Sequence, residues 1–66
     1  MKKLVCIINP IAGKGNGRTI ADIVRKNLDS TVYDFSIRFT EYGGHAGEIA
    51  AEAASQGADI VVAVGG

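Results

Sequence analysis

The chain has 66 residues, a single cysteine, and seven basic against seven acidic residues, so its formal net charge is zero. A domain of this length buries only about 60% of its unfolded surface and is marginal on its own, and a lone cysteine offers no disulfide to stabilise it. The balanced charge without a basic run argues against nucleic acid as a partner, and the short apolar run near the N-terminus argues against a signal peptide or a membrane span.

The first expected element is a strand over residues 3–8, which are apolar after Lys3, as in a strand covered on both faces. Cys6 lies within this run and is interpreted as a small buried hydrophobe, not as a reactive thiol. A glycine-rich loop over residues 9–17 follows, with the sequence Asn-Pro-Ile-Ala-Gly-Lys-Gly-Asn-Gly. This loop therefore connects a strand to the next helix.

The helix after the loop is expected over 18–28, because apolar residues recur there at helical spacing. Its buried stripe is predicted to comprise Ile20, Ile23, Val24 and Leu28. Thr19 and Asp22 have the spacing of a capping box, and the alternative is that Thr19 already lies inside the first turn of the helix. A second strand is expected over 33–40, where apolar and polar residues alternate strictly, which indicates a strand near the sheet edge with one wetter face.

The second helix is expected over 45–56, followed by Gly57 as its C-cap. Its small-residue stripe is predicted to comprise Ile49, Ala50, Ala53 and Ala54. A third strand, again apolar on both faces, is expected over 60–64. The order β-α-β-α-β predicts the α/β class, with a three-layer arrangement around a parallel sheet and right-handed crossovers.

Every glycine except Gly57 follows the end of a predicted strand, in three groups along the chain: Gly13, Gly15 and Gly17, then Gly43, Gly44 and Gly47, then Gly65 and Gly66. Ligands of parallel sheets bind outside the carboxyl ends of the strands, and glycine lets a backbone N–H approach them closely. The first loop leads into a helix N-terminus and carries Lys14 and Arg18, which favours a phosphate site. The alternative is a glycine-rich connection that binds no ligand, although a simple turn needs only one or two glycines and no basic residues. Lys14 is followed by glycine, so the loop is not a Walker A motif, and the G-x-G-x-x-G spacing also fails.

Other candidate residues keep two interpretations. Asn9 offers an amide to a ligand or initiates an Asn-Pro turn; Thr40 offers a hydroxyl to a phosphate or is an ordinary strand residue. His45 is expected in the first turn of the second helix, near a nucleotide or capping the helix end, and not as a catalytic base. Glu41 and Glu48 are interpreted as solvated residues beside the glycines. No Cys/His cluster suggests zinc.

Together, four pieces of the chain resemble the start of a diacylglycerol kinase catalytic domain, a family that includes bacterial lipid kinases, sphingosine kinases and ceramide kinases. They are Asn-Pro-Ile-Ala-Gly-Lys-Gly at 9–15, Thr40, Gly-His-Ala at 44–46 and Val-Ala-Val-Gly-Gly at 62–66. The resemblance covers the whole chain. The family pattern continues with Asp-Gly-Thr, so residues 1–66 resemble the truncated N-terminal part of an NAD kinase/diacylglycerol kinase-like nucleotide-binding domain.

This resemblance implies a lipid kinase that transfers the γ-phosphate of ATP to the hydroxyl of diacylglycerol or a similar lipid, with Mg²⁺. The implied ATP contacts are Asn9, Pro10, Ile11, Ala12, Gly13, Thr40, Gly65 and Gly66. The general base and lipid pocket would lie outside this chain, so we expect the fragment alone to be inactive. The intact protein is expected to be cytoplasmic, with peripheral contact at the inner face of the membrane, and a homo-oligomer is left open. Two rivals remain: a non-catalytic nucleotide-binding module and an NAD kinase-like soluble kinase.

Overall fold

The computed structural model describes residues 1–11 and 17–64, which form the alternating elements expected from the sequence. Their order is β1 (Lys2–Ile8), α2 (Gly17–Asn27), β2 (Tyr33–Phe39), α3 (His45–Ser55) and β3 (Ile60–Val64). Each boundary lies within a residue or so of its predicted place, as is usual for the fraying ends of helices and strands. Because α2 already begins at Gly17, Thr19 is inside its first turn and does not occupy the predicted capping position.

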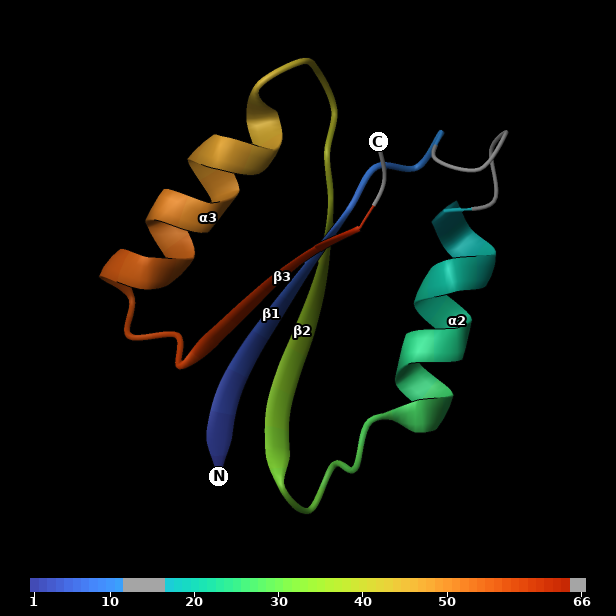
Figure 1. Cartoon of the computed structure of the whole chain (residues 1–66), viewed down its shortest axis with the longest axis vertical. Coiled ribbons are helices and arrows are strands. Elements are labelled where there is room, and N and C mark those ends of the chain that lie inside the picture. The colour runs from blue at the N-terminus through green and yellow to red at the C-terminus, as the bar shows by residue number, and fades with distance from the viewer. Residues whose placement is uncertain (12–16, 65–66) are drawn as a thin grey trace.

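The three strands form one parallel sheet in the order β2-β1-β3. Cys6, in the middle of β1, pairs in register with Ile37 on one side and Val62 on the other. Figure 1 shows α2 and α3 on opposite faces of this sheet, which gives three layers. The predicted α/β class and the position of β2 at a sheet edge are both confirmed.

One half of the core lies between the sheet and α2. Alternate residues of β1, Leu4, Cys6 and Ile8, pack there with Ala21, all nearly inaccessible to solvent. Ala21 was absent from the predicted stripe of α2, whereas Ile23, which was included, is 54% exposed. Side chains on a helix advance by about 100° per residue, so the stripe that runs through Ala21 leaves Ile23 at its margin. Burial also raises the pKa of the Cys6 thiol, in keeping with its predicted structural role.

The other half of the core lies between the sheet and α3. The other two buried residues of β1, Val5 and Ile7, pack there against Ile49 and Ala53. The predicted stripe of α3 is correct except for Ala54, which is exposed. Partly buried alanines complete this half: Ala46, Ala50 and Ala58. The buried face of α3 thus extends toward its N-terminus and leaves Ala54 at the border.

The C-terminus of α3 is closed by glycine, as predicted. Gly57 has a φ of 86°, in the left-handed region that residues with a Cβ atom rarely adopt. Its N–H donates to the Ala54 carbonyl at 3.1 Å, and the Ala58 N–H donates to the Ala53 carbonyl at 3.0 Å. These two hydrogen bonds form a Schellman motif, which satisfies carbonyl groups that the helix leaves without partners.

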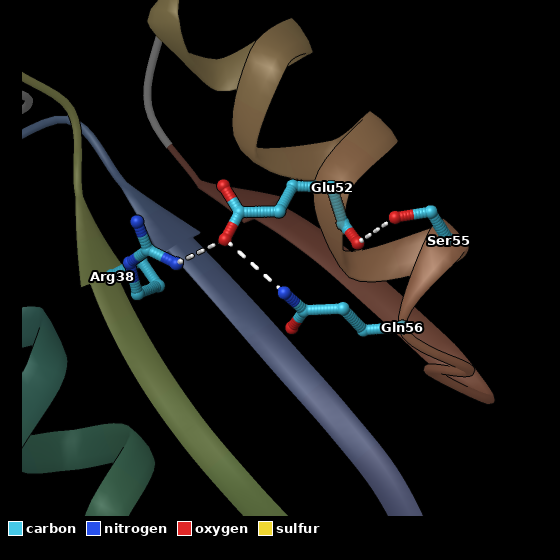
Figure 2. Close-up of polar contacts among 4 residues, drawn as sticks. All are labelled: Arg38, Glu52, Ser55 and Gln56. Carbon is cyan, nitrogen blue, oxygen red and sulfur yellow. Dashed lines mark hydrogen bonds and ion pairs between the residues drawn. The ribbon is translucent and has the colours of Figure 1, made fainter.

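A polar group on α3 also reaches the edge strand β2. Figure 2 shows Arg38 of β2 facing Glu52 of α3, with an N–O separation of 3.8 Å. Gln56 donates to the same carboxylate at 3.4 Å, and the Ser55 hydroxyl donates to the Glu52 carbonyl at 2.7 Å. Both charged side chains are about half exposed, so this ion pair contributes about 0–1 kcal/mol. Along β2 the polar residues are exposed and the apolar residues only partly so, which confirms that the polar face of this strand is the wetter one.

The strand β3 is less covered than its apolar sequence predicts. Val61 and Val62 are 38% and 39% exposed, because β3 lies at the second edge of the described sheet. Its start is held to β1 by two reciprocal hydrogen bonds of 2.8 Å, from the Lys3 N–H to the Asp59 carboxylate and from the Asp59 N–H to the Lys3 carbonyl. In the part of the chain that the structure describes, neither helix has the length and apolar character needed to cross a bilayer.

Candidate functional site

The carboxyl ends of the three strands lie side by side at one edge of the sheet (Figure 1). Beyond the last paired residues, the Asn9 N–H donates to the Val64 carbonyl at 3.2 Å, and the Thr40 N–H donates to the Ile8 carbonyl at 2.9 Å. The hydrogen-bond ladder therefore continues one step past the strands. It fixes Asn9 and Thr40, two of the predicted site residues, at neighbouring positions on this edge.

Two hollows open at this edge, of about 220 Å³ and about 310 Å³. Asn9, Thr40, Tyr42 and Gly43 line both of them. The smaller hollow also reaches down to the strand ends at Ile7, Ala63 and Val64 and up to Gly44 and Ala46. The larger one adds Pro10, Ile11 and Glu41. The structure thus brings together the predicted residues Asn9, Pro10, Ile11 and Thr40, whereas Ala12, Gly13, Gly65 and Gly66 lie outside the described residues.

The side chain of Asn9 forms the turn that opens the glycine-rich loop. Its Oδ1 accepts the Ile11 N–H at 3.1 Å, which is an Asx turn across Pro10. The turn-initiating interpretation of Asn9 is therefore confirmed. Because the oxygen is used locally, the donors of the side-chain NH₂ group are what Asn9 has to offer a ligand.

Gly17 serves close packing at the start of α2. It is buried, and a Cβ atom there would stand 2.6 Å from the Pro10 Cα and 2.8 Å from the Asn9 carbonyl oxygen. Such separations are too short for real atoms, so only glycine fits without movement of the main chain. At this position, the missing side chain lets the helix start approach residues 9 and 10.

Side-chain contacts hold the loop between β2 and α3 against the start of α3. His45, the first residue of α3, accepts the Glu41 N–H through Nδ1 at 2.9 Å. Its ring stacks on Tyr42, with centroids 4.4 Å apart and planes 12° apart. The Tyr42 hydroxyl donates to the Glu48 carboxylate, and this hydrogen bond raises the pKa of Tyr42. Gly44 precedes the helix with a φ of 84°.

Sequence reasoning placed His45 correctly in the first turn of α3 but missed Tyr42. No pattern in the sequence marked Tyr42, because it lies in the loop before α3 and its stacking on His45 depends on the path of that loop. Glu41 and Glu48 are both exposed, as predicted, but Glu48 also binds Tyr42. We call Tyr42, His45 and Glu48 the Tyr42–His45–Glu48 cluster. This cluster borders the hollows at the sheet edge.

Arg18, one of the two expected cationic residues, is not among the residues that line these hollows. Arg18 instead lines a separate hollow of about 320 Å³ beside Phe39. Arg25, on the same hollow, pairs with Asp22 at 3.3 Å. Lys14, the other predicted cation, lies outside the described residues.

Within residues 1–11 and 17–64, no group of three or more His, Cys, Asp or Glu side chains could hold a metal ion. The hollows offer the amide of Asn9, the hydroxyl of Thr40 and the main chain of Gly43 and Gly44, which can hydrogen-bond to oxygen atoms of a ligand. Glu41 also lines the larger hollow.

The family model of the diacylglycerol kinase catalytic domain matches residues 3–66. Searches of curated proteins and of solved structures gave no significant match. The matched region takes in the five elements except Lys2, and it includes both hollows at the carboxyl ends of the strands. By its sequence, and in agreement with its parallel α/β fold, the chain belongs to the diacylglycerol kinase catalytic domain family of kinase-type enzymes.

Proposed function

We propose that the protein is an ATP-dependent lipid kinase and that residues 1–66 form the N-terminal part of its ATP-binding domain. Family membership supports a kinase-type activity. The observation that carries the ATP site is the convergence of Asn9, Pro10, Ile11 and Thr40 on adjoining hollows outside the carboxyl ends of parallel strands, the usual ligand position in such sheets.

In this proposal, the chain binds and orients the nucleotide. The Thr40 hydroxyl and the Asn9 NH₂ group donate to phosphate oxygens, and the glycines at 43 and 44 let the main chain come close. ATP supplies the phosphoryl group, which passes to the hydroxyl of diacylglycerol or a similar lipid. Phosphoryl transfer depends mainly on positioning and on stabilising charge, to which a bound Mg²⁺ would contribute.

The site is tested by titrating the complete encoded protein with ATP and measuring the heat of binding by calorimetry. We expect saturable binding and a loss of about 10-fold or more in affinity for Thr40→Val, because the substitution keeps the shape and removes a hydroxyl that binds a charged group. Thr19→Val is the matched control, since Thr19 is exposed on α2. Absence of ATP binding, or equal affinities for the two variants, would contradict the proposed site.

Phosphorylation assays with labelled ATP test the acceptor. We expect the complete protein to label diacylglycerol or a related lipid alcohol and not NAD, and the 66-residue chain alone to label neither. Transfer of the label to NAD would indicate the NAD kinase-like alternative. ATP binding by the complete protein without transfer to any acceptor would instead indicate the non-catalytic module.

A further inference from the structure

We propose that His45 is a positioning residue for the ATP site: its Nδ1 holds the loop over residues 40–44 in the shape that receives the nucleotide. This inference rests on the proposed function. It starts from the hydrogen bond of 2.9 Å between the Glu41 N–H and His45 Nδ1, which joins the loop to the first residue of α3.

The hydrogen bond fixes the second of two consecutive amides at the sheet edge. The Thr40 N–H already donates to the Ile8 carbonyl at 2.9 Å, so Thr40 is held by β1. The Glu41 N–H is held by His45 from the other side of the loop. The peptide unit before Thr40 is therefore held by Ile8 and the peptide unit after it by His45. Together they restrain the main chain of Thr40 and the direction of its side chain, which lines both hollows.

The rest of the cluster restrains the next part of the loop. Tyr42 stacks on the His45 ring and donates its hydroxyl to Glu48, one turn further along α3. The Tyr42 carbonyl accepts the His45 N–H at 3.2 Å. Each contact links the loop to α3, whose buried face is anchored in the core by Ile49 and Ala53. The position of the loop is therefore fixed relative to a helix that is itself packed against the sheet.

A simple helix cap does not account for this arrangement. The N-cap of α3 is Gly44, which has no side chain, and no side-chain hydrogen bond caps this helix. The acceptor on His45 serves a donor of the preceding loop instead. A loop that is ordered before the nucleotide arrives loses less conformational entropy on binding, and this raises affinity.

Two substitutions at one position separate the acceptor from the ring. His45→Asn keeps an acceptor at the place of Nδ1, because its Oδ1 is also bonded to Cγ, but lacks the ring. His45→Phe keeps a ring that can stack on Tyr42 but has no acceptor. The Kd for ATP of each variant of the complete protein is measured by calorimetry, and the Glu41 amide is followed by NMR in the same samples.

We expect His45→Phe to raise the Kd for ATP about 3- to 10-fold, the equivalent of one lost hydrogen bond, and to shift the Glu41 amide proton upfield. His45→Asn should rescue most of the affinity and keep the amide proton downfield, even where both variants lower the unfolding temperature alike. A role limited to helix stability would not produce this difference.

The remaining outcomes overturn the inference in distinguishable ways. If the unsubstituted protein binds ATP and both variants bind it equally well, or both are weakened alike, the acceptor at His45 does not position the loop, while the proposed ATP site stands. If the unsubstituted protein does not bind ATP, the proposed function fails and the inference fails with it.

Discussion

The main chain of Gly17 lies directly against that of Pro10, so that a Cβ atom on Gly17 would stand only 2.6 Å from the Pro10 Cα. Gly17 is the first residue of α2, and Pro10 is the second residue after β1. The contact therefore sets how closely the start of the helix approaches the end of the central strand. Since Pro10 has a fixed φ and belongs to the Asx turn of Asn9, it has little freedom to yield.

Gly17→Ala should destabilise the protein by about 1–3 kcal/mol, because an extra methyl group is forced into a filled site against main-chain atoms. Gly47→Ala is the control: a Cβ atom at Gly47 would meet nothing within 4 Å, and alanine is the better helix former by about 0.5–1 kcal/mol. Urea unfolding measures both. A stability of Gly17→Ala equal to or above that of the unsubstituted protein would contradict the close contact.

Two isoleucines, one on each helix, should differ sharply in their contribution to stability. Ile49 is 2% exposed against β1, whereas Ile23 is 54% exposed on α2. We expect Ile49→Ala to lower the free energy of unfolding by about 2–5 kcal/mol through lost contacts and a cavity. In so short a chain, this loss should leave most molecules unfolded. Ile23→Ala should cost well under half as much. Circular dichroism during thermal unfolding compares them, and similar losses would refute the assigned packing of the two helices.

Gly57→Ala tests the left-handed residue after α3. A residue with a Cβ atom pays roughly 1–2 kcal/mol in that conformation, and 1 kcal/mol lowers the melting temperature of a domain this small by about 4–8 °C. Gly57→Asn should lose less, since asparagine tolerates this region better. Scanning calorimetry provides both values. An alanine variant that melts no lower than the asparagine variant would count against the Schellman motif.

Asp29 should make the stability of the turn before β2 depend on pH. Its Oδ1 accepts the Thr31 N–H at 2.8 Å and the Thr31 hydroxyl at 2.5 Å, and the side-chain bond in particular lowers the pKa of Asp29. The unfolded chain therefore binds this proton more readily than the folded one, so the contribution is present near neutral pH and lost as pH falls below about 4.

The matched variant for this test is Asp29→Asn, which retains an oxygen acceptor but cannot titrate in this range. The unfolding free energy of the unsubstituted protein should fall more steeply between about pH 5 and pH 2 than that of Asp29→Asn. Equal slopes across this range would show that the Asp29 carboxylate is not stabilised in the fold.

The order and type of the elements followed from the sequence because each had a periodicity of its own. The strict alternation of residues 33–40 identified β2 as an edge strand with one polar face, and Gly57 marked the end of α3 before any contact was known. The meeting of Asn9 and Thr40 was also predictable, since parallel strands bring their carboxyl ends to one edge.

What only the tertiary structure decided are the relations between elements. Periodicity favoured Ile23 for the core of α2, but the position of the helix over the sheet buried Ala21 instead. Composition could not show that β1 is central and β3 lies at an edge, because both sequences are apolar. The stack of Tyr42 on His45 depends on the path of a loop through Gly44. Local sequence sets backbone preference and hydrophobic pattern, whereas the close fit of neighbouring side chains is settled only when the whole chain packs.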